Sequence, residues 1–168
     1  VDTARHQELV QQYQVDDFHS PFVFYEPGFN LRSTDLNAFI GLEQLRKLDA
    51  MTSRRQANHD RYLEQLGTRF YTQRPPQGSK VASISFGLLA DSPEQRKRIV
   101  RALVAEGVET RIFSAGNLGL HPFWMNRYGK ASFPVADRVH HCGFFLPNHA
   151  SMTDQDVLQI SRIVLEAA

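Results

Sequence analysis

Two helix-start signatures stand near short apolar runs in the second half of the chain, and together they restrict the fold more than any other feature. Ser92-Pro93-Glu94-Gln95 combines a capping serine, a proline at the first helical position and a glutamine three residues after the cap. Thr153-Asp154-Gln155-Asp156 is a second capping signature. The apolar patterns predict strands over residues 81–86, 108–113 and 144–147. Two helices that cover one small sheet predict an α+β fold.

Helical periodicity dominates the first half of the chain. Ser33 or Thr34 is placed to cap a helix whose apolar residues run from Leu36 to Leu48, with Asp35 near the positive end of the helix dipole. Because these apolar residues fall on more than one side, we expect this helix to be buried on two sides. Further helices are predicted over residues 4–14, 51–67 and 133–141. A long helical arm therefore precedes a β-α-β core.

Breaker residues and aromatic residues suggest how the chain is divided. The cluster Arg74-Pro75-Pro76-Gln77-Gly78 marks a boundary. The run from Phe18 to Phe29 is rich in aromatic side chains and suits a strand or a buried loop against a partner surface. We therefore predict three parts, which are an aromatic, dimer-contacting arm over residues 1–33, a helical connector over 34–74 and a small α+β domain over 75–168.

The charge balance and the cysteine count exclude several classes of protein. The 168 residues include 19 basic and 18 acidic side chains, and this balance does not favour nucleic acid or a polybasic membrane contact. No stretch reaches the roughly 20 apolar residues that span a bilayer. Cys142 is the only cysteine, which excludes an intrachain disulfide and suits a reducing, cytoplasmic setting. Because the chain starts at Val1, we expect a processed or truncated product.

The segment before the capped helix is the first candidate site. Gly28, Asn30 and Arg32 come directly before the expected helix N-terminus at Ser33 or Thr34. Free backbone N–H groups, the helix dipole and the Arg32 guanidinium would all favour a bound phosphate. On spacing alone, a capped helix with an exposed arginine explains the same residues.

A loop after the expected strand 108–113 is the second candidate site. Residues 114–124 contain two glycines for backbone freedom, Asn117 and His121 as hydrogen-bond donors, and Trp124 as a flat apolar surface. This mixture suits a loop that closes over a polar ligand such as a sugar, although aromatic residues that simply fill the core would also explain it. His140-His141-Cys142 lacks the ligand spacing of a metal site, so we predict none there. The sequence contains no complete catalytic constellation.

Two motifs carry a resemblance to a known family. Residues 27–45 read PGFNLRSTDLNAFIGLEQL. The order of glycine, aromatic residue, Asn-x-Arg, polar pair and Ala-x-x-Gly-x-x-Gln-Leu resembles the DegT/DnrJ/EryC1 family of sugar aminotransferases. Gly107 to Arg111, Ser114 to Asn117 and His121-Pro122-Phe123 resemble the branch of this family that contains pyridoxal-phosphate sugar 3-dehydratases.

The resemblance implies a homodimeric fold-type I enzyme that uses pyridoxal phosphate. This chain would be its small C-terminal domain, with a small antiparallel sheet covered by helices and a long helical arm. By the motif match, Asn30 would reach the phosphate of the neighbouring subunit's cofactor, and Arg32 would help to bind phosphate or a substrate anion. The sugar side of the cleft would be lined by Arg111, Ser114, Gly116, Asn117 and His121.

The same resemblance implies what this chain lacks. The lysine that holds the cofactor, or the histidine that replaces it in the GDP-sugar dehydratases, would lie upstream of residue 1, so the chain by itself is predicted to be inactive. The related CDP-sugar dehydratases use a cysteine-bound iron–sulfur cluster, which a chain with only Cys142 cannot ligate.

The leading hypothesis is therefore part of an enzyme of deoxysugar and lipopolysaccharide biosynthesis. It would act on a nucleotide-linked sugar, with 3-dehydration of a GDP-linked 4-keto-6-deoxyhexose favoured over amino transfer. The alternative is a stand-alone ligand-binding or regulatory module without chemistry, since small α+β folds also serve that purpose. The aromatic arm argues against this alternative, because so much apolar surface calls for a partner.

Overall fold

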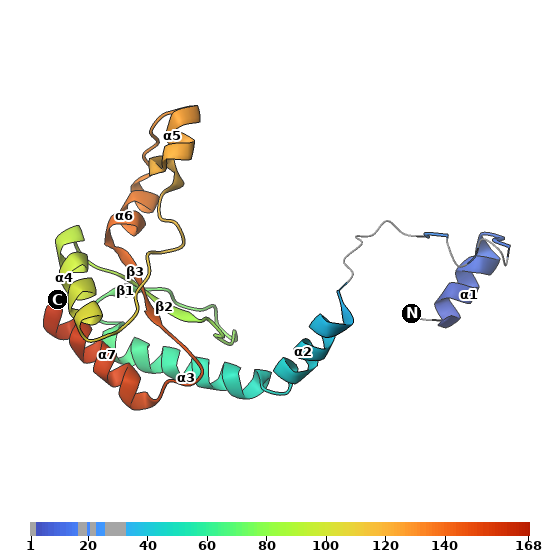
Figure 1. Cartoon of the computed structure of the whole chain (residues 1–168), viewed down its shortest axis with the longest axis horizontal. Coiled ribbons are helices and arrows are strands. Elements are labelled where there is room, and N and C mark those ends of the chain that lie inside the picture. The colour runs from blue at the N-terminus through green and yellow to red at the C-terminus, as the bar shows by residue number, and fades with distance from the viewer. Residues whose placement is uncertain (1–2, 17–19, 21–22, 26–32) are drawn as a thin grey trace. The chain divides into compact units, whose positions relative to one another are not determined.

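The chain divides into two units. The computed structural model describes residues 3–16, 20, 23–25 and 33–168 (Figure 1). The first unit comprises Val1–Gly41 and the second Leu42–Ala168. Among the described residues, no helix is both long enough and apolar enough to cross a membrane.

The described part of the first unit is mainly helical. α1 spans Thr3–Gln12, which confirms the helix predicted over residues 4–14. α2 spans Asp35–Leu45 and continues past the boundary between the units. The Thr34 hydroxyl accepts a hydrogen bond from the Asn37 backbone N–H at 3.2 Å, so Thr34 caps α2 as expected. Most of the aromatic run from Phe18 to Phe29, including Phe18, Phe22 and Phe29 themselves, lies outside the described residues.

The apolar residues of α2 are exposed within this chain. Their exposed fractions lie between 51 and 67% for the set Leu36, Phe39, Ile40, Leu42 and Leu45. The expected burial of this helix on two sides is therefore not provided by the described residues of the chain itself. Burial against another protein surface stays a prediction.

A three-stranded antiparallel sheet forms the centre of the second unit. β1 (Tyr71–Thr72) pairs with β2 (Ser85–Leu89), and β2 pairs with β3 (Gly143–Pro147). Side chains alternate between the two faces of a strand, so Phe86 and Leu88 of β2 share one face with Phe144 and Leu146 of β3. All four are buried in the core.

Three helices cover this apolar face. α3 (Leu48–Leu66), α4 (Pro93–Ala105) and α7 (Asp154–Ala167) supply the rest of the core, and α7 contacts both α3 and α4, as Figure 1 shows. Their main buried side chains are Tyr62, Leu66, Ile99, Leu103, Val157 and Val164. The predicted small antiparallel sheet with covering helices is thus confirmed. Because β1 (Tyr71–Thr72) pairs with β2 (Ser85–Leu89), the sequence-based boundary near residue 75 falls between two strands of one sheet.

Both helix-start signatures do begin helices, as predicted. The Ser92 hydroxyl accepts from the Gln95 N–H, and Pro93 occupies the first turn of α4. Thr153 and Asp156 form a reciprocal capping box at the start of α7. α3 begins three residues before the predicted residue 51, and α6 (Pro134–Cys142) confirms the helix predicted over residues 133–141.

Two predicted strands differ from the structure. The strand predicted over residues 81–86 begins only at Ser85, because the Ser83 hydroxyl bonds to the Ser85 backbone and the Asn148 amide holds the Ser83 carbonyl. The strand predicted over 108–113 is reduced to one bridge, between Arg111 and Phe145. Beyond that bridge the Phe113 side chain packs onto the sheet face, and the chain leaves the edge of β3.

Two helical elements of the second unit were not predicted. A 3-10 turn, η2 (Leu118–Leu120), is followed by α5 (Pro122–Tyr128), which has a proline in its first turn and Gly129 after its last residue. In Figure 1, α5 and α6 lie beyond the end of the sheet at which β3 begins.

Candidate functional site: a cavity on the second face of the sheet

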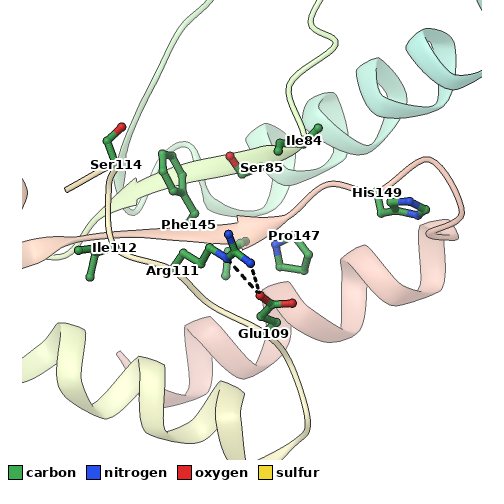
Figure 2. Close-up of a pocket in the computed structure, with 10 residues that line it drawn as sticks. Ile84, Ser85, Glu109, Arg111, Ile112, Ser114, Phe145, Pro147 and His149 are labelled. Atoms are coloured by element: carbon green, nitrogen blue, oxygen red, sulfur yellow. Dashed lines mark hydrogen bonds and ion pairs between the residues drawn. The ribbon is translucent and has the colours of Figure 1, made fainter. Parts of the chain in front are cut away.

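A cavity of about 520 Å³ lies on the second unit where the 109–114 segment runs past β2 and β3 (Figure 2). Ser85, Phe145 and Pro147 enter from the strands, and Glu109, Arg111 and Ser114 enter from the segment. Ser85 pairs with Pro147 in the ladder, and cross-strand partners share a face. These residues therefore meet on the face opposite to the helical core. His149, Ile84, Ile112 and Leu146 complete the lining.

Arg111 is held to the sheet by its backbone. The Phe145 N–H donates to the Arg111 carbonyl at 2.7 Å, and the Arg111 N–H donates to the Phe145 carbonyl at 3.4 Å. Its guanidinium donates to the Glu109 carboxylate at 3.0 and 3.1 Å, as drawn in Figure 2. Both side chains are largely exposed, 78% for Arg111 and 74% for Glu109. Because this ion pair is exposed to solvent, it contributes little free energy to the fold, and the guanidinium stays available to a ligand anion.

Phe113 anchors the segment after Arg111. Its ring stacks on Phe145 with centroids 4.2 Å apart. A Cβ atom on Gly87 would lie 2.4 Å from the Phe113 ring, and one on Gly143 would lie 2.8 Å from it. Two glycines of the strands thus make the space that Phe113 fills.

The predicted loop from Ser114 to His121 turns sharply at its start. Ser114 has a φ of 48°, in the left-handed region, and the Gly116 N–H donates to the Phe113 carbonyl at 2.7 Å. Gly116 has a φ of 66°, and a Cβ atom there would lie 2.2 Å from Nδ1 of His140. Only glycine fits at Gly116, because both its conformation and its close approach to α6 exclude a side chain.

Asn117 is buried and fully engaged within the protein. Its Nδ2 donates to the Ala131 carbonyl at 3.2 Å and to the Asp137 carboxylate at 2.5 Å, and its Oδ1 accepts from the Gly119 N–H at 2.8 Å. Its backbone N–H donates to Nδ1 of His140 at 3.2 Å. Only 3% of Asn117 is exposed. Direct contact between this side chain and a ligand would require one of these hydrogen bonds to open.

His121 also bonds within the loop. Its Nε2 lies 2.8 Å from the Ala115 carbonyl, so Nε2 carries the proton and donates. The following aromatic residues pack locally, with Trp124 and Tyr128 rings 4.8 Å apart. Phe123 is 61% exposed. Residues 114–128 therefore make most of these contacts with one another. The side chains of Phe123 and Tyr128 are exposed and do not fill the core.

The environment of α6 affects two titratable groups next to the loop. Hydrogen bonds from Ser132 and Asn117 lower the pKa of Asp137, so this carboxylate is ionised at neutral pH. Partial burial, together with His141 and His121, lowers the pKa of His140. A neutral His140 can accept the Asn117 N–H, whereas a protonated one cannot.

The structure thus brings together some of the predicted site residues. Arg111 and Ser114 line the cavity, whereas Gly116, Asn117 and His121 face α6 or the interior of the loop. Asn30 and Arg32 lie outside the described residues, so their predicted contacts with a cofactor stay predictions. Within the described part of the chain, no group of three or more histidine, cysteine and acidic residues could hold a metal ion.

Sequence reasoning did not identify Ser85, Glu109 or His149 as lining residues. No sequence signal indicates Ser85, because its position opposite Pro147 follows from the pairing of β2 with β3. Glu109 stands two residues before Arg111, a spacing that puts both side chains on one side of an extended segment. No sequence signal indicates His149, which reaches the cavity from the turn after β3.

Comparison with known proteins adds a family match over nearly the whole chain. The model of the DegT/DnrJ/EryC1/StrS aminotransferase family matches residues 3–165. The chain is 30% identical over 111 residues to the GDP-4-keto-6-deoxy-D-mannose 3-dehydratase of Yersinia pseudotuberculosis. That match covers 65% of this chain and 28% of the relative.

Solved structures share the fold of this chain. The E. coli GDP-4-keto-6-deoxy-D-mannose-3-dehydratase with bound hydrated PLP gives a TM-score of 0.67 at 24% identity, covering 89% of this chain and 40% of that one. The aminotransferase TlmJ from Streptoalloteichus hindustanus gives a TM-score of 0.70 at 27% identity, covering 86% of this chain and 39% of that one. The chain spans less than a third of the length of the Yersinia relative and about two fifths of these structures.

Proposed function

The chain belongs to the DegT/DnrJ/EryC1/StrS aminotransferase family, and on this premise we propose that it is the sugar-side portion of a pyridoxal-phosphate enzyme that modifies nucleotide-linked deoxysugars. The reaction would be 3-dehydration of a 4-keto-6-deoxyhexose or amino transfer to such a sugar. The product would enter deoxysugar or lipopolysaccharide biosynthesis, and the enzyme would work in the cytoplasm as a homodimer. The observation that carries the proposal is the cavity at Arg111 and Ser114, within residues matched by the family model.

The chemistry of the cavity fits an oxygen-rich ligand. The Arg111 guanidinium supplies charged donors for a phosphate or a sugar oxygen, and the Ser85 and Ser114 hydroxyls both donate and accept. Phe145 and Pro147 supply an apolar floor, which suits the carbon face of a sugar ring. We assign the cavity to the substrate, because its guanidinium, its hydroxyls and its apolar floor suit a sugar that carries a phosphate.

The cofactor contacts belong in this proposal to other residues. Asn30 and Arg32 would hold the phosphate of pyridoxal phosphate, with Asn30 reaching across the dimer. When bound, the cofactor supplies the electron sink that stabilises a carbanion on the sugar. In this proposal the residues of the cavity bind and orient the sugar.

A stand-alone regulatory module is the less favoured alternative. The family model matches residues 3–165, including α1 and α2, which such a module would not need. The identity of one residue in the complete polypeptide would separate the two enzymatic reactions. A lysine at the position that holds the cofactor favours transamination, whereas a histidine favours dehydration because it serves as a base without a covalent link.

Three substitutions in the complete polypeptide that carries this sequence test the proposal. Arg111→Ala should raise KM for the nucleotide sugar about tenfold or more and leave cofactor retention unchanged, because one charge-assisted contact with the substrate is lost. Asn30→Ala should instead weaken cofactor retention by about 1.5–3 kcal/mol. His121→Ala should raise KM and spare the cofactor, through the loss of the loop contact to Ala115.

Arg162→Ala is a matched control, because Arg162 is an exposed arginine that lies 3.8 Å from a glutamate on α7. Steady-state kinetics and cofactor dissociation should show no change for this variant. An Arg111→Ala enzyme with an unaltered KM would contradict the assignment of the cavity. An Asn30→Ala enzyme that keeps its cofactor as tightly as the parent would contradict the cross-subunit contact.

The 168-residue chain by itself should neither hold pyridoxal phosphate at a defined site nor convert a nucleotide sugar. Absorbance spectroscopy and equilibrium dialysis with the cofactor check this expectation. Stoichiometric binding with a new visible absorption band would show that the active site has been misplaced.

A further inference from the structure

The first part of the loop, residues 114–116, is fixed at both ends. At the first end, Phe113 is wedged between the sheet glycines Gly87 and Gly143. At the other end, Asn117 is bonded to α6 and to the segment before it. Ser114, which lines the cavity, lies between these anchors in a left-handed turn. The position of Ser114 therefore depends on both anchors.

α6 supplies the second anchor from one face of the helix. Asp137 and His140 are three residues apart and so lie on the same side of α6. Asp137 accepts from the Asn117 side chain, whereas His140 accepts from the Asn117 backbone. The other carboxylate oxygen of Asp137 accepts from the Ser132 hydroxyl at 2.5 Å. Asp137 thus joins the loop, the segment before α6 and α6 itself.

We propose that Asp137 is a positioning residue for substrate binding, because its carboxylate locks Asn117 and thereby fixes the turn that presents Ser114 to the cavity. This inference rests on the proposed function, in which the cavity receives the nucleotide sugar. Asp137 does not line the cavity, so it acts through Asn117 and not by contact with the ligand. Asn117, expected from sequence to touch the sugar, is in this account the connection between α6 and the loop.

Kinetics of the complete polypeptide test the functional part of this inference. Asp137→Ala should raise KM for the nucleotide sugar about tenfold with kcat within about twofold, since a mispositioned loop weakens binding of the substrate and of the transition state equally. Asp137→Asn should restore KM to near the parent value, because the amide oxygen still accepts from Asn117 and the amide nitrogen can donate to Ser132. Rescue by the amide would show that hydrogen bonding, and not the negative charge, is what matters.

Asp154→Ala is the matched control. Asp154 is likewise a helical aspartate bonded to other side chains, Arg54 and Arg61, but it lies on α7 away from the loop. This variant should lose some stability and keep the parent KM. If Asp137→Ala and Asp154→Ala have the same KM, or if Asp137→Asn behaves like Asp137→Ala, the inference is wrong.

A measurement on the 168-residue chain separates this inference from the proposed function. In ¹⁵N-labelled chain, Asp137→Ala should shift or broaden the side-chain NH₂ signal of Asn117 and the backbone signals of Asn117 and Gly119, whereas Asp137→Asn should leave them sharp. Unchanged signals in Asp137→Ala would overturn the positioning role even if the enzyme converts nucleotide sugars. Altered signals in a polypeptide that converts none would instead leave the loop anchor standing and refute the proposed function.

Discussion

His59 occupies an unusual place for a titratable residue. It is 5% exposed on α3, and its ring packs edge-on against Phe86 of β2 with centroids 5.2 Å apart. Burial lowers the pKa of His59, and the Asp60 carboxylate 3.8 Å away opposes this effect only in part. The folded protein therefore keeps the imidazole neutral at a pH where the unfolded chain binds a proton.

The stability of the second unit should consequently decrease in mild acid. An unfolded histidine titrates near a pKa of about 6.5, so unfolding takes up a proton below that pH and the free energy of unfolding falls. The full stability is present above this pH. His59→Phe keeps the aromatic contact with Phe86 and should make the free energy of unfolding less dependent on pH. Urea unfolding at pH 5 and pH 8 would measure this. His149→Gln, at an exposed histidine, is the control and should keep the parent's difference in the free energy of unfolding between pH 5 and pH 8. The same difference in His59→Phe as in the parent would refute the explanation.

Single residues of the site differ in how far sequence could reveal them. Arg111 and Ser114 follow from their motifs and do line the cavity. Asn117 and His121 were recognised as polar loop residues, but sequence does not tell whether a polar group faces a ligand or its own loop. That choice depends on α6, which brings Asp137 to within 2.5 Å of Asn117 across 20 residues of chain. Tertiary contacts of this kind leave no local pattern.

Among the elements, the helix starts were the most predictable features. Caps act within four residues, so Ser92 and Thr153 identify α4 and α7 without knowledge of the fold. β1 has only two residues and depends on pairing with β2, which gives it no signal of its own. α5 could have been inferred from Pro122 and Gly129, which stand at its two ends.

The capping box of α7 offers a test at this scale. The Thr153 hydroxyl accepts from the Asp156 N–H at 3.2 Å, and the Asp156 carboxylate accepts from the Thr153 N–H at 2.7 Å. Thr153→Ala should lower the free energy of unfolding by about 1 kcal/mol, measured by urea denaturation. Because both residues serve one motif, Thr153→Ala with Asp156→Ala should cost less than the sum of the single changes. Strict additivity would show that the two hydrogen bonds act independently.

At the scale of the whole molecule, the main feature is the apolar surface of α2, which the described residues of the chain leave exposed. Phe39 and Leu42 are 66 and 60% exposed, and their neighbours on this helix are similar. Apolar surface of this kind marks a contact with another protein surface. The sequence pattern predicted that α2 is buried, but it does not identify the covering surface.

The 168-residue chain should therefore self-associate. Sedimentation velocity should show the average mass rising with concentration, and Phe39→Glu with Leu42→Glu should abolish the rise by placing charges in the contact. Val104→Glu is the control, because Val104 is 60% exposed but lies on α4. A parent chain that stays monomeric at high concentration would count against burial of α2 by a second copy.

The bridge between Arg111 and Phe145 has a further consequence for the sheet. An unpaired strand edge is a template on which a strand of another molecule can add, and aggregation often begins there. On β3, the Arg111 backbone already takes the N–H and the carbonyl of Phe145. The two backbone hydrogen bonds that hold Arg111 beside the cavity thus also occupy this part of the edge of β3. Changes to residues 109–113 that detach the segment from β3 would expose the backbone of Phe145 to strands of other molecules, so the sequence of this segment affects aggregation as well as the shape of the cavity.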